Sequence, residues 1–241
     1  ISIITVRSNY AASSGVVGQS GDVLLGIGYT LITALLLLRL SFSAFSLTRI
    51  NANSAHCEKR SILRLLSLAQ ETIGLSRKVT LKFNDEIASP MSFGLLNPVV
   101  ILPSVALDWK ESTLEDVFVH ELSHIRRLDW VSMLFCHLMT SLLWIHPLVW
   151  CARNRVDESA EQACDAAVLR SGTDGVNYAE DLLRLAKESL GDIRAPLLAQ
   201  LMFEQSSLSL RIRNILDGKL MGKARKPFVV SLLIGALLLV S

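Results

Sequence analysis

The longest apolar stretch of the chain lies near its N-terminus. Residues 23–38 carry no charge and stand between Asp22 and Arg39, and residues 40–48 are uncharged as well. A helix that spans a bilayer needs about 20 apolar residues, and an arginine near its end can extend the guanidinium to the interface. The pattern therefore predicts a transmembrane helix over residues 22–45. Basic residues follow this run instead of preceding it, which argues against a signal peptide.

A second apolar run occupies residues 227–241 and predicts the start of a further membrane helix. The flanks of both runs that face the middle of the chain are rich in lysine and arginine, whereas Arg7 is the one basic residue before the first run. By the positive-inside rule, residues 46–226 face the cytoplasm and residues 1–21 form an N-terminal extramembrane segment. Because the chain starts at Ile1 and stops within an apolar run, we expect it to be part of a longer protein.

Between these two runs, residues 131–150 carry no formal charge apart from two histidines, His137 and His146. Arginines flank this segment on both sides, so the charge pattern gives no direction for a crossing. We expect a helical hairpin, or a helix packed partly into the membrane, with Pro147 kinking or ending the helix. A complete span is the alternative. The two histidines are expected to be core or interface groups and not metal ligands.

The other segments predict a small α+β unit, so the fold class is mainly α with a small β-sheet. Helical spacing of apolar residues predicts a helix over residues 61–75, and alternation predicts a strand over 79–83. Residues 99–102 are a short apolar run between two prolines, which is typical of an edge strand. A capping box at residues 112–115 predicts the start of the next helix. Further helices are predicted over residues 156–170, 178–190 and 208–216.

Composition supports a membrane protein and argues against nucleic-acid binding. The chain is 51% hydrophobic and 19% charged, whereas a soluble domain has about 25% charged residues. Its net charge of +2 is too small to indicate a nucleic-acid partner. The four cysteines form no C-x-x-C pair, and we interpret them as free thiols in a reducing compartment.

The sequence His-Glu-Leu-Ser-His at residues 120–124 is the strongest indication of chemistry. His120 and His124 are four residues apart in a predicted helix, so they share one face. Two imidazoles at this spacing can hold one Zn²⁺ at about 2.0–2.1 Å. Glu121 lies beside such a metal and can take a proton from a water that the metal activates. This pattern predicts a metal-dependent peptidase, although the pentapeptide alone also occurs by chance in helices.

A third metal ligand is expected from the acidic segment at residues 157–165. Glu161 and Asp165 are four residues apart and project from one helical face. Glu161 can supply the third ligand of a single Zn²⁺ per chain, and Asp165 can accept the N–H of a ligand histidine. The alternative is a solvated acidic face paired with Arg153 and Arg155, which leaves the spacing of the two acids unexplained.

Two further features have more than one interpretation. Asp129 lies five residues after His124 and either orients that ligand or caps the turn that follows the helix. The backbone of Val99, Val100 and Ile101 can accept a substrate peptide as an added strand, or this strand only packs against its neighbours. We expect Cys164 to be a small buried packing residue.

Four stretches together resemble the integral-membrane metallopeptidases of the BlaR/MecR type, the β-lactam sensor-transducers and their relatives. They are residues 89–94 (SPMSFG) continuing to 98–103 (PVVILP), residues 120–124 (HELSH) continuing to 129–130 (DW), residues 144–147 (WIHP), and residues 161–165 (EQACD). Residues 178–190 and 211–216 also resemble downstream helices of the family. The resemblance covers roughly residues 20 to 241.

The resemblance implies a gluzincin-like zinc protease domain combined with transmembrane helices. It implies that His120, His124 and Glu161 are zinc ligands and that Glu121 is the catalytic acid/base. It further implies a multi-pass protein of the bacterial cytoplasmic membrane, with the protease domain in the cytoplasm. The substrate is then a protein or peptide, such as a cytoplasmic repressor or the chain itself, and a homodimer is an open possibility.

Two other functions are compatible with the same residues. The first is a non-catalytic membrane transducer whose zinc only holds helices together. The second is a housekeeping membrane protease, similar in motif to the CAAX-processing and heat-shock zinc proteases. In the best-known members of the family that the chain resembles, an extracellular sensor domain follows. The chain ends before such a domain, so a sensing role does not follow from the resemblance.

Overall fold

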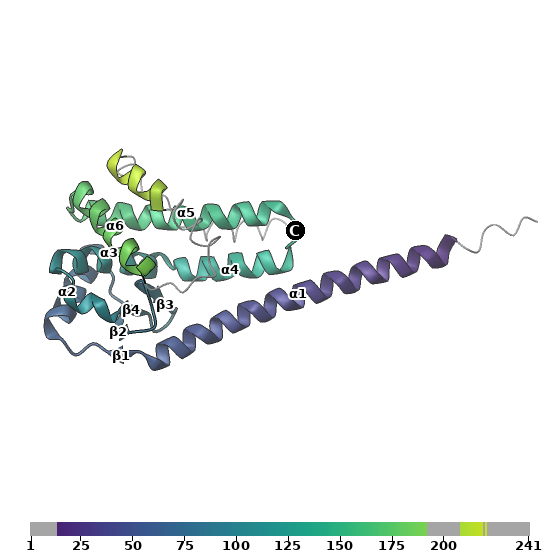
Figure 1. Ribbon diagram of the computed structural model, residues 1–241, viewed down its shortest axis with the longest axis horizontal. Helices are drawn as coiled ribbons and strands as arrows, with labels where there is room; N and C mark the ends of the chain where they lie inside the picture. The colour runs from purple at the N-terminus through teal and green to yellow at the C-terminus, as the bar shows by residue number, and fades with distance from the viewer. Residues whose placement is uncertain (1–13, 192–207, 219, 221–241) are drawn as a thin grey trace, which may run out of the picture.

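Helix α1 (Ser14–Asn53) is the longest element and extends away from the rest of the molecule (Figure 1). The computed structural model describes residues 14–191, 208–218 and 220. Within these residues, one helix, Gly21–Asn53, is long and apolar enough to cross a membrane, with a mean hydropathy of 2.1.

The helix predicted over residues 22–45 is therefore confirmed as a helix and extends beyond both predicted ends. Membrane crossing by this helix stays a prediction. The second apolar run, residues 227–241, and the basic residues that precede it lie outside the described residues.

A four-stranded mixed sheet follows helix α1 along the chain. Its order is β1 (Ala55–His56), β2 (Thr80–Asn84), β4 (Val99–Pro103) and β3 (Met91–Phe93). Strand β4 runs parallel to β2 and antiparallel to β3, and β1 is antiparallel to β2. All five residues of β4 are buried. The near-continuous apolar run in β4 is what a central strand covered on both faces requires.

The prediction of an edge strand over residues 99–102 is therefore wrong. Strand β2 and the three-residue strand β3 pair with the two sides of β4. Because its backbone groups are already paired, the backbone of Val99, Val100 and Ile101 cannot accept a substrate strand. Among the described residues, the free side of β3 is the sheet edge nearest to these positions.

Helices α2 (Arg60–Ile73) and α3 (Glu111–Arg127) pack against each other and build the core with β2 and β4. The short 3₁₀ helix η1 (Ser104–Asp108) connects β4 to α3. Apolar residues three and four apart form the buried stripe of each helix: Ile62, Leu65, Leu66, Ala69 and Ile73 in α2, and Leu114, Val117, Phe118, Leu122 and Ile125 in α3.

The helices predicted over residues 61–75, 178–190 and 208–216 are confirmed with small shifts of their ends. Helix α6 spans Gly175–Gly191, and a further helix spans residues 208–216. The predicted capping box is wrong, because α3 begins at Glu111 and the residue before it, Lys110, makes no side-chain cap.

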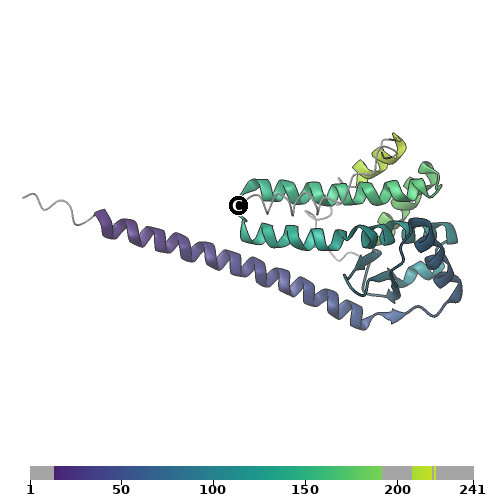
Figure 2. The ribbon, with the colours of Figure 1, turned by 180° about the vertical axis from the view of Figure 1, so that it is seen from behind.

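Helices α4 (Asp129–Leu142) and α5 (Pro147–Arg170) form a long antiparallel hairpin (Figures 1 and 2). This confirms the hairpin expected within residues 131–150. However, Pro147 starts the second helix instead of ending the first. Proline suits the first position of a helix, because an N–H group there would have no hydrogen-bond partner within the helix. His146 caps the same turn by accepting a hydrogen bond from Leu148 N at 3.3 Å.

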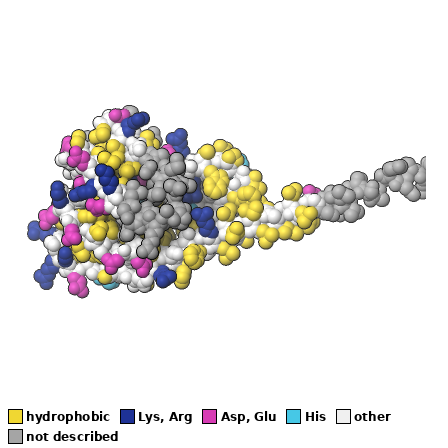
Figure 3. Space-filling view, in the orientation of Figure 1, with side chains coloured by type: hydrophobic (Ala, Val, Ile, Leu, Met, Phe, Trp, Pro, Cys, Tyr) yellow, Lys and Arg dark blue, Asp and Glu magenta, His cyan; other side chains and the backbone are white. Residues whose placement is uncertain are grey.

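The tip of the hairpin lies against the apolar part of α1. The Tyr29 hydroxyl donates to the carbonyl of Leu142, and the Tyr29 ring stacks on Trp144 with ring centroids 6.1 Å apart. Large apolar side chains at the tip are exposed: Leu143, Ile145, Leu148 and Trp150. Figure 3 shows hydrophobic side chains along α1 and at this tip, whereas charged side chains gather on the remainder of the visible face.

Candidate metal centre

Helix α3 presents His120 and His124 on one face, one helical turn apart. Their ring centroids are 5.0 Å apart, and their side chains are 12% and 16% exposed. The opposite face of α3 is anchored in the core by Phe118 and Leu122, which are fully buried. The packing of α3 therefore holds both imidazoles in place.

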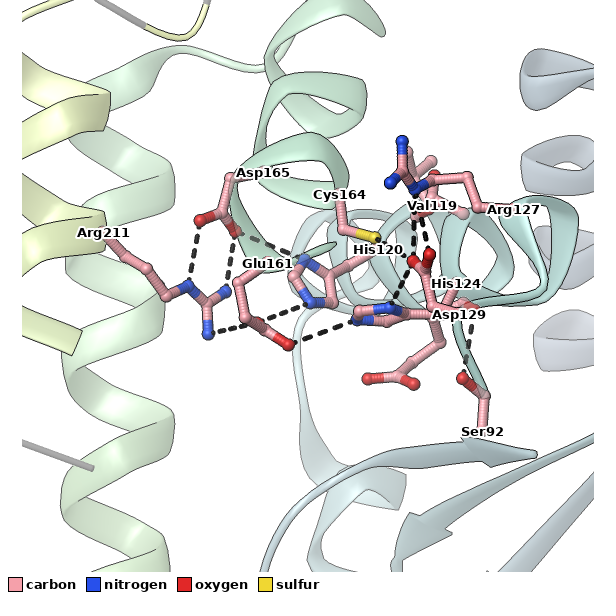
Figure 4. Close-up of polar contacts among 12 residues, drawn as sticks. Ser92, Val119, His120, His124, Arg127, Asp129, Glu161, Cys164, Asp165 and Arg211 are labelled. Carbon is pink, nitrogen blue, oxygen red and sulfur yellow. Dashed lines mark hydrogen bonds and ion pairs between the residues drawn. The ribbon is translucent and has the colours of Figure 1, made fainter. Parts of the chain in front are cut away.

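Helix α5 brings Glu161 to these two imidazoles (Figure 4). Glu161 Oε2 is 3.5 Å from His120 Nε2, and Oε1 is 3.5 Å from His124 Nε2. The ligand atoms of the three residues all lie within 4.8 Å of one another. Ligand atoms about 2.1 Å from one tetrahedral Zn²⁺ lie roughly 3.4 Å from each other. The three residues thus fit a metal ion and leave a fourth position open.

Two further carboxylates contact the other nitrogen of each imidazole. Asp165 Oδ1 is 3.3 Å from His120 Nδ1, and Asp129 Oδ2 is 3.1 Å from His124 Nδ1 (Figure 4). Contacts of this kind fix the tautomer of a ligand histidine and raise its basicity. Asp129 is the first residue of α4, after the N-cap Leu128. Its position therefore favours the ligand-orienting interpretation over the helix-capping one.

Positive charge is strongly favoured between these carboxylates. Burial lowers the pKa of His120, but hydrogen bonds to Asp165 and Glu161 outweigh burial and raise it to about 10. Burial raises the pKa of Glu161, but hydrogen bonds to His120 and His124 bring it well below its usual value. Burial likewise raises the pKa of Asp165, yet contacts with His120 and Arg211 lower it to about 2. Buried carboxylates need a positive partner, and a dication bound to neutral imidazoles provides one.

Glu121 follows His120 in α3 and is 9% exposed. Its backbone carbonyl accepts a hydrogen bond from Ser92 Oγ at 3.1 Å, which ties β3 to this turn of α3. The described residues contain two groups of potential metal ligands: His120, His124 and Glu161, and also His124, Asp129 and Cys164. Neither group includes Glu121. Cys164 is fully buried, as expected for a packing residue.

The solvated acidic face accounts for only part of the acidic segment. Asp157 lies 3.9 Å from Arg153, and Glu158 lies 3.4 Å from Arg155, each measured between side-chain nitrogen and oxygen. Glu161 instead faces the two histidines of α3. The spacing of Glu161 and Asp165 therefore places both acids against the histidines of α3. Surface ion pairing does not explain this arrangement.

Residue spacing in the sequence did not predict two residues of the metal centre, Tyr178 and Arg211. Tyr178 of α6 donates its hydroxyl to Asp165 Oδ1 at 2.9 Å, and its oxygen lies 3.1 Å from His120 Nδ1. Arg211 of helix 208–216 contacts both Glu161 and Asp165. Both residues come from elements far along the chain, where no local pattern links them to the pentapeptide. The one indication in the sequence was that residues 178–190 and 211–216 resemble downstream helices of the BlaR/MecR-type family.

Comparisons with known proteins give a consistent family assignment. The family model described as BlaR1 peptidase M56 matches residues 4–215. The Regulatory protein BlaR1 of Bacillus licheniformis is 28% identical over 212 residues, which cover 85% of this chain and 35% of that protein. The Methicillin resistance mecR1 protein of Staphylococcus aureus is 24% identical over 135 residues, which cover 54% of this chain and 23% of that protein. The chain thus spans only about a third of the length of the first relative and less of the second.

Proposed function

The chain belongs to the BlaR1 peptidase M56 family, and from this premise we propose that it is a membrane-embedded, zinc-dependent endopeptidase of a signalling pathway. Its substrate is a cytoplasmic regulatory protein or the chain itself. The observation that carries the proposal is the convergence of His120, His124 and Glu161 from two helices, with carboxylates behind both imidazoles. A site for a structural zinc needs four protein ligands, whereas this group offers three.

The residues of the centre divide the chemistry of peptide hydrolysis among them. Zn²⁺, when bound, polarises the scissile carbonyl and lowers the pKa of water to about 7. His120, His124 and Glu161 hold the ion, and Asp165 and Asp129 keep the two imidazoles oriented. Glu121 accepts the proton of the attacking water and passes it to the leaving amine.

We place the substrate on the outer side of strand β3 and not on β4. Among the described residues, this side of Met91–Phe93 has no strand partner. The hydrogen bond from Ser92 to the carbonyl of Glu121 holds the strand beside the catalytic turn. An extended peptide that pairs with β3 would gain main-chain hydrogen bonds and run past the metal centre.

We place the tip of the α4–α5 hairpin, with its exposed apolar side chains, at the midplane of the bilayer, and the helix lengths agree with this position. From Pro147 to Glu161, helix α5 rises about 21 Å, and half of a hydrocarbon core is about 15 Å. A hairpin tip at the bilayer midplane therefore places the metal centre just outside the hydrocarbon. Tyr29 contacts this tip, and Arg39 lies about 15 Å further along α1. The same placement brings Arg39 to the edge of the hydrocarbon, where its charge is tolerated.

The test compares Glu121→Gln with a matched control, Glu115→Gln, which removes an exposed carboxylate from the same helix. New protein N-termini in the membrane and cytoplasm are measured by mass spectrometry, together with the length of the chain itself. We expect Glu121→Gln to reduce cleavage by about 10²–10⁴-fold, the usual contribution of a general base, and Glu115→Gln to cleave normally.

Cleavage products that persist unchanged in the Glu121→Gln strain would refute the enzymatic function in favour of a non-catalytic transducer. The number of proteins left uncut in the Glu121→Gln strain distinguishes a signalling protease from a housekeeping protease. One or a few uncut proteins agree with signalling, whereas a broad set indicates a housekeeping protease.

A further inference from the structure

Arg211 reaches the metal centre from helix 208–216, whereas the three candidate metal ligands lie on helices α3 and α5 (Figure 4). Its Nη1 lies 2.9 Å from Glu161 Oε2. Its Nη2 and Nε donate to Asp165 Oδ1 and Oδ2 at 2.7 and 2.9 Å. The Arg211 side chain is 17% exposed. One guanidinium thus binds two carboxylates that lie one turn apart on α5.

The shape of the guanidinium is essential for this arrangement. Its donors form a rigid planar fork, so two of them can bind Asp165 side by side while a third points to Glu161. An ammonium group is a point charge without this fixed geometry. Lysine at position 211 would keep the positive charge but could not hold both carboxylates in defined orientations.

The contact with Glu161 bears directly on how that residue can bind a metal. A carboxylate can bind a metal through one oxygen or through both. If Glu161 used both, its second oxygen would compete for the position that a catalytic site keeps open for water. Each oxygen of Glu161 lies 3.5 Å from one imidazole, Oε2 from His120 Nε2 and Oε1 from His124 Nε2. Arg211 binds only Oε2, and this charge-assisted hydrogen bond occupies a lone pair of Oε2 and weakens it as a metal ligand. The guanidinium therefore opposes two-oxygen binding by Glu161.

We propose that Arg211 is a positioning residue that restricts Glu161 to metal binding through one oxygen and, through Asp165, keeps His120 oriented. Helix 208–216 is then a required part of the metal centre. The proposal rests on the function proposed above, because it specifies how the same three ligands leave a position for water.

The experiment measures metal binding and not proteolysis. The whole chain carrying Glu121→Gln is purified in detergent, and Arg211→Lys is compared with Arg213→Lys, a change at an exposed position of the same helix. Zinc affinity is determined by competition with a chelator. The visible absorption of bound Co²⁺ reports the number of ligands, because it is stronger for four ligands than for five.

We expect Arg211→Lys to weaken zinc binding by about 10–100-fold, as is usual when a residue that supports a metal ligand is changed. We also expect a weaker Co²⁺ absorption as Glu161 binds through both oxygens. Arg213→Lys should match the parent chain in both measurements. Wild-type affinity together with an unchanged Co²⁺ spectrum in Arg211→Lys would overturn the proposal.

A second variant covers the case in which Arg211→Lys does not fold. Asp165→Asn releases the guanidinium from the other side, and unchanged zinc affinity and Co²⁺ absorption in that variant overturn the proposal equally. Failure of the proposed function has a different signature. A parent chain that binds no zinc contradicts the metallopeptidase, whereas a parent that binds zinc and variants that bind it identically contradict only the role of Arg211.

Discussion

Asp116 of α3 should make the stability of the folded chain depend on pH. The residue is 8% exposed, and Oδ1 accepts a hydrogen bond from Thr173 at 2.6 Å. Burial raises the pKa of Asp116 from 3.8 to about 6; the hydrogen bond from Thr173 opposes this shift, and the nearby Asp181 and Glu115 add to it. The folded chain therefore binds a proton here more tightly than the unfolded chain does.

The sign and size of the effect follow from this difference. The stabilisation from the protonated carboxyl is fully present below pH 4 and is lost as the pH rises to about 6. A shift of about two pKa units corresponds to at most about 3 kcal/mol. Because the effective dielectric constant at buried sites in proteins is well above that of a dry interior, we expect less than this limit, ~1–2 kcal/mol. Asp116→Asn keeps the acceptor for Thr173 and removes the charge, so it should be more stable than the wild type at pH 7.

The assay is thermal unfolding of the detergent-solubilised chain between pH 4.5 and 8. Asp116→Asn should raise the Tm by about 3–6 °C at pH 8, and this gain should shrink as the pH falls below about 6. Asp108→Asn, a change at an exposed position, should show no such trend. A Tm difference for Asp116→Asn that is the same at pH 5 and pH 8, or a destabilised variant at pH 8, would refute the electrostatic explanation.

Two other predictions concern the core and the metal. Phe118→Ala removes a fully buried ring from the face of α3 opposite the histidines, and it should cost about 3–5 kcal/mol in denaturant unfolding; a cost below about 1 kcal/mol would mean that α3 is not anchored as described. Zinc at roughly 100 times its Kd should stabilise the chain by about 2.7 kcal/mol. A chelator should abolish that gain, and His124→Ala should show none from the start.

Local spacing was sufficient to place the candidate metal ligands on common helix faces and to predict most helices. His120 and His124, like Glu161 and Asp165, are four residues apart, and the pitch of an α-helix alone places each pair on one face. The same periodicity predicted the buried stripe of α2. The uncharged run before Arg39 predicted α1 because apolar length is a property of the sequence itself.

Contacts across the sheet could not be predicted in the same way. Residues 99–102 have the composition and the flanking prolines of an edge strand, yet β4 is central because β2 and β3 occupy both of its sides. The number of neighbours of a strand depends on other segments of the chain. The capping box failed for a related reason, since α3 begins one residue before it at Glu111.

The sequence by itself determined which side chains can bind a metal, because their chemistry and helical spacing are local properties. Only the tertiary structure decided that two helices meet so that Glu161 lies 3.5 Å from both imidazoles. It also brought Arg211 and Tyr178 to Asp165 from later helices. These contacts arise from packing between elements that are distant in the chain, and packing depends on the shape of the whole core and not on any single segment.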